Sequence, residues 1–262
     1  MLARLKIINT YSFLFFGSKL KKEDGARNEA KRLIIALGYN CNNDCIFCGI
    51  SAKKRTKTKS KEEIKGRLLK ARKDGIEKIV FSGGEPTIHE AFIELIDFAK
   101  KQRFREIEIM TNGRAFSDKV FAKKVVDSGA KKFLFNIISH KQNVHDFITQ
   151  RKGSFAETVE GIKNLKKLGA KIEGNLLVLK QNYKSLRKTI EFFSKLGLSK
   201  IYISFPEFRG DAKKHKEKIK VDPKKASPFI LKCFAPSNSN VELEFINGSV
   251  QKQADHRIQQ SA

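Results

Sequence analysis

The chain has 262 residues, of which 40% are hydrophobic and 31% charged, and this length suits one enzyme-sized domain. Its 54 Lys and Arg against 28 Asp and Glu give a formal net charge of +26, which would suit anionic partners such as nucleic acid. However, lysines spread along a chain more often form a solvated face. Four cysteines in a chain this long exclude a disulfide scaffold and indicate a reducing compartment, for which we expect the cytoplasm.

The first 31 residues are predicted to form a short N-terminal extension. An apolar patch lies within residues 5–16, but Asn9, Thr10 and Ser12 interrupt it, and it is far shorter than the ~20 residues needed to cross a bilayer. We therefore expect an edge element packed on the core, and no membrane anchor.

From Arg32 onward, short β-branched runs alternate with longer segments of helical period, which predicts βα units around a parallel sheet. The predicted strands are Arg32–Leu37, Lys78–Ser82, Glu106–Thr111, Lys132–Ile138, Ile172–Leu179 and Lys200–Phe205. The predicted helices are Lys61–Asp74, His89–Gln102, Asp118–Ser128, Phe155–Leu168 and Tyr183–Leu196. After Pro206 the pattern weakens, and we expect a loosely packed extension over residues 211–262.

Three of the four cysteines lie within eight residues, just after the first predicted strand. Cys41, Cys45 and Cys48 are spaced so that one irregular loop can direct three thiolates at a common centre. Soft thiolates favour iron–sulfur clusters or zinc. A structural zinc site needs four ligands, and Cys233 is the sole candidate for a fourth. A cubane cluster on three cysteines leaves one iron open to a ligand; buried cysteines without metal are the remaining alternative.

The three cysteines, with Phe47 before the last, match the pattern Cys-x3-Cys-x-aromatic-Cys. This pattern resembles the motif of the radical S-adenosylmethionine (SAM) superfamily. The resemblance implies a 4Fe-4S cluster on Cys41, Cys45 and Cys48, with SAM chelating the fourth iron through its amino and carboxylate groups. It also implies a place for Phe47 near the adenine, with ordinary core packing as an equal alternative.

A second motif follows the second predicted strand, where Gly83, Gly84, Glu85 and Pro86 form a turn whose proline fixes the backbone. Alone it is an ordinary tight βα connection. Beside the cysteines it resembles the superfamily's Gly-Gly-Glu-Pro motif. The resemblance implies that these four residues bind the methionine amino group of SAM.

Asparagines near the ends of later strands are further candidates, because α/β barrels build their sites at the C-terminal ends of the strands. Asn112 follows the third predicted strand, and Asn136 and Asn175 lie in the fourth and fifth. The resemblance implies contacts to SAM, in the case of Asn175 to its ribose. Structural hydrogen bonding is an equal alternative for Asn112 and Asn136.

The stretch Ser139–Gly153 is long and polar for a βα connection, and such loops often shape substrate pockets. His145 within it is a candidate for proton transfer, although a single histidine is as easily a surface or a packed residue. Ser154 is predicted to cap the following helix, with Glu157 completing a capping box.

The resemblance covers residues 32–210 and implies an α/β fold, a partial open (β/α)6 barrel with N- and C-terminal extensions at 1–31 and 211–262. It implies an enzyme that splits SAM at the reduced cluster into methionine and a 5'-deoxyadenosyl radical, which takes a hydrogen atom from a small-molecule or peptide substrate. An electron donor such as flavodoxin or ferredoxin is then required. Residues 222–246 resemble a family region that usually continues to a further cysteine-containing stretch, so we expect a truncated or divergent C-terminus. Cys233 stands alone, which predicts no second cluster.

Two alternative functions stay open. One is a radical SAM enzyme that modifies tRNA or another RNA, which the positive charge would suit. The other is a non-catalytic zinc or iron–sulfur protein. Cleavage of SAM by the reduced protein would separate the enzymes from the second alternative.

Overall fold

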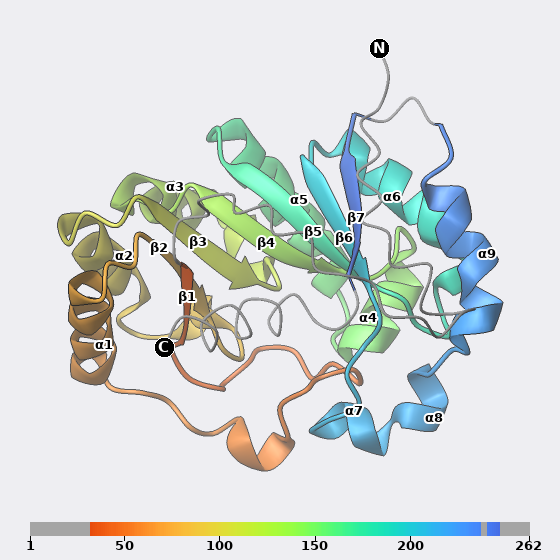
Figure 1. Ribbon diagram of the computed structural model, residues 1–262, viewed down its shortest axis with the longest axis horizontal. Coiled ribbons are helices and arrows are strands. Elements are labelled where there is room, and N and C mark those ends of the chain that lie inside the picture. Colours follow the sequence, from red (N-terminus) through yellow and green to blue (C-terminus); the bar gives the residue numbers. More distant parts are fainter. Residues whose placement is uncertain (1–31, 237–239, 247–262) are drawn as a thin grey trace, which may run out of the picture.

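Within the residues that the computed structural model describes, 32–236 and 240–246, seven parallel strands form one sheet and follow one another in chain order (Figure 1). The strands are β1 (Arg32–Ala36), β2 (Lys78–Ser82), β3 (Glu106–Thr111), β4 (Lys132–Ile137), β5 (Lys171–Leu177), β6 (Lys200–Ser204) and β7 (Glu242–Ile246). The sheet curves into a partial barrel (Figure 1). The barrel is open, because in this part of the chain β1 and β7 each pair with a single neighbour. The predicted N-terminal edge element lies outside the described residues.

Helices connect the strands, namely α1 (Lys61–Lys73), α2 (Phe92–Lys101), α3 (Lys119–Ser128), α4 (Gln142–Thr149), α5 (Ser154–Lys167), α6 (Leu186–Lys195), α7 (Asp211–Lys214), α8 (Lys216–Ile219) and α9 (Pro223–Cys233). The longer helices form a layer that covers the outer side of the sheet, whereas α7 and α8 lie beyond the ends of the strands (Figure 1). The main core lies between this layer and the sheet, with fully buried rings such as Phe81, Phe133 and Phe193. No helix in the described ranges is long and apolar enough to cross a membrane.

The six predicted strands are confirmed, with ends that differ by at most two residues. The five predicted helices are present as well, but α2 and α6 begin three residues late. A 3-10 turn precedes each of them, at Pro86–Ile88 before α2 and at Tyr183–Ser185 before α6. A further helix, α4, lies inside the stretch 139–153, which the sequence predicted to be a loop.

The expectation of loose packing after residue 210 is wrong for the described part of that region. α9 buries Ala226, Ile230 and Cys233, and β7 extends the sheet beside β6. Pro223 does not interrupt α9, because it occupies the first turn, where its missing N–H is no loss, directly after the capping residue Asp222.

Buried charges fill the N-terminal end of the barrel interior. Side chains alternate across a strand, so Glu173 shares the inward face of β5 with Asn175, and Lys132 shares that of β4 with Asn136. The Lys132 ammonium lies 3.1 Å from Glu108 and 3.3 Å from Glu173, and each carboxylate is almost fully buried. Because these charges pair with one another, the free-energy cost of burying them is lower. They occupy the N-terminal end of the barrel, so the cavity lies at the C-terminal end.

Candidate active site

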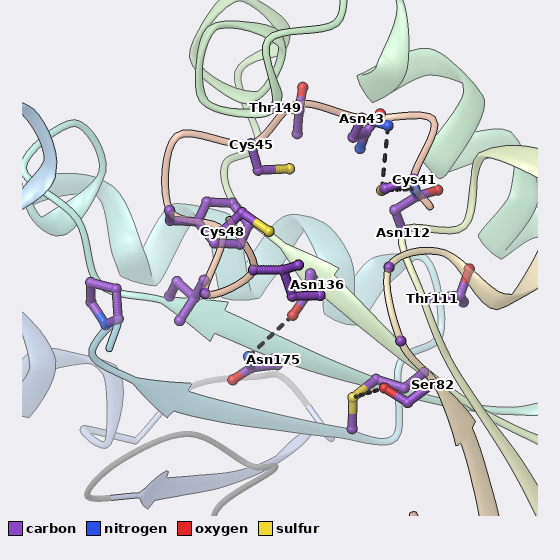
Figure 2. A pocket seen from close by; sticks show the side chains of 18 of the residues that line it. Cys41, Asn43, Cys45, Cys48, Ser82, Thr111, Asn112, Asn136, Thr149 and Asn175 are labelled. Carbon is purple, nitrogen blue, oxygen red and sulfur yellow. Dashed lines mark hydrogen bonds between the residues drawn. The ribbon is translucent and has the colours of Figure 1, made fainter. Parts of the chain in front are cut away.

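The C-terminal ends of the strands surround a cavity of about 450 Å³ (Figure 2). All three clustered cysteines line it. The other predicted site residues on its wall are Phe47, Gly83, Gly84, Asn112, Asn136, His145 and Asn175. The structure therefore brings together, at one end of the barrel, residues that span more than 130 positions of the sequence.

The sulfur atoms of Cys41, Cys45 and Cys48 point toward a common space above the strand ends (Figure 2). Burial raises the pKa of the Cys41 thiol to about 11, and it also raises the pKa values of Cys45 and Cys48. At neutral pH the metal-free loop therefore carries neutral thiols, and a bound metal would have to displace their protons.

This donor set fits a cubane cluster better than zinc. In the described residues, no three side chains of the His, Cys, Asp or Glu type are close enough to share one metal ion. A cubane does not need that closeness, because each cysteine binds a different iron atom. The zinc alternative with Cys233 is wrong: this residue lies on α9 in the main core, where its thiol donates to the Phe229 carbonyl at 3.2 Å.

We call residues 37–51, which carry the three cysteines, the cysteine loop. The glycine turn after β2 holds the start of this loop. The backbone N–H of Gly84 donates to the Gly38 carbonyl at 3.0 Å, and that of Glu85 donates to the Asn40 carbonyl at 2.8 Å. A Cβ atom on Gly83 or Gly84 would come within 2.1 Å of these same carbonyl oxygens. The two sequence motifs are thus in direct backbone contact, and this contact requires glycine.

Two helices support the rest of the cysteine loop. The N–H groups of Asp44 and Ile46, on either side of Cys45, donate to the carbonyls of Thr149 and Ile148 in α4, each at 3.0 Å. From the other side, the Ala212 N–H of α7 donates to the Cys48 carbonyl at 2.9 Å.

Arg55 joins the cysteine loop to α7 through ion pairs with Asp44 and Asp211. Neither Arg55 nor Asp211 was singled out from the sequence. Only the fold brings together two residues that are 156 positions apart.

Glu85 and Pro86 do not line the cavity. The Glu85 carboxylate is buried beneath the turn, where it accepts hydrogen bonds from the Thr87 and Thr111 hydroxyls, each at 2.7 Å, and from the Asn112 N–H at 2.7 Å. Burial raises the pKa of Glu85, while these hydrogen bonds oppose that increase. The geometry gives Glu85 a positioning role for the loops after β2 and β3.

Asn112 supports the cysteine loop from the end of β3. Its amide nitrogen donates to Asn42 Oδ1 at 2.7 Å and lies 3.9 Å from the Cys41 sulfur. The neighbouring Arg114 donates to the Asn42 carbonyl at 2.5 Å and to Asn43 Oδ1 at 2.9 Å. These contacts favour the structural interpretation of Asn112, while its place on the cavity wall leaves a ligand contact open.

Asn136 and Asn175 belong to a hydrogen-bonded chain across three strands, and Figure 2 shows the bond between the two asparagines. Ser204 of β6 donates to Asn175 Oδ1 at 2.9 Å, and Asn175 Nδ2 donates to Asn136 Oδ1 at 3.2 Å. The two asparagines face each other in register on β4 and β5. Each amide is held in a fixed orientation at the floor of the cavity.

His145 lies on α4 and is 2% exposed. Burial lowers the pKa of its imidazole to about 4, so the ring is neutral at physiological pH. Its ring packs against that of Phe155 in a T-shaped pair with the centroids 5.6 Å apart, and Nδ1 has no hydrogen-bond partner among the described residues.

The predicted capping box at Ser154 and Glu157 is wrong. Gly153 is the N-cap of α5, and Asp146 of α4 accepts hydrogen bonds from the Gly153 and Phe155 N–H groups and from the Ser154 hydroxyl, at 2.8 to 2.9 Å. Glu157 pairs with Arg114 instead. The helix is capped by a carboxylate from the preceding helix, which local sequence rules do not foresee.

Further residues on the cavity wall carry no motif of their own. They include Tyr39, Lys54, Ser82, Thr111, Thr149 and Arg209. Ser82 and Thr111 are the last residues of β2 and β3, and this position could have indicated them. Thr149 and Arg209 follow from the packing of α4 and α7 and had no such signal.

These features together define a partial α/β barrel with a three-cysteine cluster site at the C-terminal ends of its strands. Residues 35–193 match the family model of the Radical SAM superfamily, and the chain belongs to this superfamily. Enzymes of this superfamily use a 4Fe-4S cluster and SAM.

Curated relatives of the chain include proteins named as cyclases of GTP. A probable GTP 3',8-cyclase of Saccharolobus solfataricus is 28% identical over 173 residues, which are 65% of this chain and 55% of the relative. The GTP 3',8-cyclase of Aquifex aeolicus is 28% identical over 182 residues, 67% of this chain and 56% of the relative. The chain thus matches little more than half the length of these relatives.

Solved structures with a similar fold include Streptococcus suis SuiB bound to the precursor peptide SuiA, with a TM-score of 0.68 and 16% identity over 87% of this chain and 51% of that one. Another is anSMEcpe with bound AdoMet, with a TM-score of 0.66 and 17% identity over 82% of this chain and 64% of that one. At this identity the likeness concerns the fold alone.

Proposed function

We propose that the protein reductively cleaves SAM at a 4Fe-4S cluster held by Cys41, Cys45 and Cys48. The observation that carries this proposal is that three converging thiols and the glycine turn share one cavity at the C-terminal strand ends. When bound, the reduced cluster supplies one electron that splits SAM into methionine and a 5'-deoxyadenosyl radical, which then takes a hydrogen atom from the substrate.

The residues around the cluster site would hold SAM in place. The backbone of Gly83 and Gly84 lines the cavity and can contact the methionine end. Asn136 and Asn175 present oriented amides at the floor, suited to the ribose hydroxyls, and Phe47 offers an apolar ring for the adenine. Glu85 and Pro86 would act indirectly by fixing this turn.

The substrate class we propose is a small molecule or a peptide. The names of the curated relatives make GTP the first small molecule to test, and the peptide bound to SuiB makes peptides the second class. Lys54 on the cavity wall is exposed and would suit an anionic group on either substrate. Arg55 and Arg209 also line the cavity, but they already pair with carboxylates of the protein.

An electron donor with an acidic surface, such as flavodoxin or ferredoxin, would supply the electron. Exposed lysines lie on the segments that adjoin the cysteine loop: Lys57 follows it in the chain, and Lys213 and Lys218 lie in the α7–α8 segment. The Ala212 N–H of α7 donates a hydrogen bond to the Cys48 carbonyl, so the backbone of the α7–α8 segment contacts the backbone of a proposed cluster ligand. We call these three lysines the basic cover.

Anaerobic reconstitution with iron and sulfide tests the proposal. The wild-type protein should bind a cluster and, when reduced with dithionite, cleave SAM. Cys45→Ala should lose both properties, whereas Cys233→Ala should keep both, because that thiol lies in the core away from the cavity. A wild-type protein that binds no iron and sulfide, or a Cys45→Ala variant that still cleaves SAM, would contradict the proposal.

A further inference from the structure

His145 is a buried polar side chain whose hydrogen-bonding capacity the described residues do not meet. The residue is 2% exposed, and its Nδ1 atom lies inside the protein without a partner among them. A neutral imidazole always has one N–H donor and one acceptor nitrogen. A buried nitrogen of either kind without a partner costs about 1–3 kcal/mol of protein stability. If this position served packing alone, phenylalanine or leucine there would make the protein more stable than histidine does.

Its neighbours do not account for the ring. Asp146, the next residue, directs its carboxylate to the start of α5 and not to the imidazole. Phe155 contacts the ring by its edge and offers no lone pair. The second histidine of this region differs, because the His140 Nδ1 atom lies 3.1 Å from the Thr189 hydroxyl and is satisfied within the protein.

The position of α4 directs His145 to the Cys45 side of the cavity. Thr149 follows His145 by one helical turn on the same face and donates its hydroxyl to the His145 carbonyl at 3.0 Å. The carbonyl groups of Ile148 and Thr149 receive the N–H groups that flank Cys45, and Thr149 lies beside Cys45 in Figure 2. His145 and Thr149 both line the cavity wall there.

The Nδ1 atom is sealed from the cavity, so Nε2 is the ring nitrogen that can face it. We propose that His145 donates a hydrogen bond from Nε2 to a sulfur atom of the cluster on the side of Cys45 and thereby makes the cluster easier to reduce. This inference rests on the proposed function, since it requires the cluster. Reduction adds negative charge to the sulfur atoms, so a donor stabilises the reduced form more than the oxidised form and raises the reduction potential. His145 is then a tuning residue for the electron transfer that precedes the chemistry on SAM.

The test compares the reduction potential of the reconstituted cluster in the wild type and three variants, by redox titration with EPR detection and without SAM or substrate. His145→Phe removes both nitrogens and should lower the equilibrium constant for reduction about tenfold, which is about 59 mV for one electron. His145→Asn places an amide near the position of Nδ1, and His145→Gln places one near Nε2. His145→Gln should restore most of the potential, and His145→Asn should not, because only Nε2 can face the cavity.

The matched control is His140→Gln, which changes a histidine that is already satisfied by Thr189 and should leave the potential unchanged. A second measurement excludes a structural effect: without the cluster, His145→Phe should be as stable to urea as the wild type or more stable, because it removes an unmet nitrogen.

Equal potentials in the wild type and all His145 variants would overturn the proposal. So would an unchanged potential in His145→Phe together with a raised KM for SAM, since that would assign the ring to SAM binding. Should His145→Phe fail to retain a cluster, the Asn and Gln variants must differ from each other in potential, and equality would again refute the idea. Failure of the proposed function is distinguishable, because the wild type itself would then assemble no cluster.

Discussion

The Glu85 carboxylate accepts the backbone N–H of Asn112 at 2.7 Å, so the loops after β2 and β3 are joined by a buried charged hydrogen bond. The same carboxylate accepts hydrogen bonds from Thr87 and Thr111. Asn112 in turn contacts Asn42 of the cysteine loop. Glu85 therefore links the turn proposed for SAM to the loop proposed for the cluster, although it touches neither ligand site directly.

Glu85→Gln should weaken SAM binding without removing the cluster. An amide can present only one acceptor oxygen, so its NH2 group would face a donor from Thr87, Thr111 or Asn112. Losing a hydrogen bond to a charged group costs about 1.5–3 kcal/mol, or about tenfold to 150-fold in Kd if it is expressed in binding. Equilibrium binding of SAM to reconstituted protein measures the effect. Glu90→Gln, an exposed neighbour, is the control and should bind as the wild type does.

Gly84→Ala should displace the cysteine loop. The new Cβ atom would lie 2.1 Å from the Asn40 carbonyl oxygen and 2.3 Å from that of Tyr39, so backbone has to move. We expect a loss of about 1–3 kcal/mol in the free energy of unfolding and less iron per chain after reconstitution.

Gly66→Ala is the matched control for that substitution. Gly66 lies on the exposed side of α1, and no atom lies within 4 Å of the place that its new Cβ atom would take. This change should stabilise the protein by about 0.5–1 kcal/mol, because alanine favours the helix. Urea unfolding measures the free energy of unfolding of both variants. A Gly84→Ala protein as stable as the wild type would contradict the close contact between the two motifs.

The strands and the cysteine cluster could be predicted from the sequence because their signals are local. A strand such as Lys78–Ser82 is a short apolar run, and three thiols within eight residues need no knowledge of the fold. The contacts that shape the site are not local: Arg55 meets Asp211 across 156 positions, and Glu85 meets Thr111 across 26.

The errors in the prediction arose where tertiary contacts override local patterns. α4 is eight residues long and polar at its start, so it resembles a loop until Ile148 and Thr149 pack against the cysteine loop. β7 follows a helix with prolines and has its Glu242 and Glu244 paired with Lys200 of β6. Its strand character depends on that neighbour more than on its own sequence.

Asp146→Asn should destabilise the protein by about 1–2 kcal/mol near neutral pH, since the carboxylate caps α5. Burial would raise the pKa of Asp146, but hydrogen bonds from Phe155, Gly153 and Ser154 outweigh it and lower the pKa below its usual value. The folded pKa is thus below the unfolded value, so the stabilisation is complete above the unfolded pKa and disappears as the pH falls through the folded pKa. Unfolding free energies of the two proteins, measured from neutral pH downward, should therefore converge in acid, and a constant difference would contradict this account.

Reversal of charge on the basic cover should slow reduction by a protein donor and leave reduction by a small molecule unchanged. The triple variant Lys57→Glu, Lys213→Glu, Lys218→Glu alters the three exposed side chains of the basic cover, and none of the three lines the cavity.

Association steered by opposite charges falls steeply with such reversals and with ionic strength. We expect at least about a tenfold slower reduction by an acidic flavodoxin at low salt, a smaller difference at high salt, and equal reduction by dithionite. The control is Lys119→Glu, Lys167→Glu, Lys195→Glu, which changes the net charge equally on the outer helices α3, α5 and α6. If both triple variants slow the protein donor to the same extent, the net charge and not the cover governs docking, and the assignment of this surface fails.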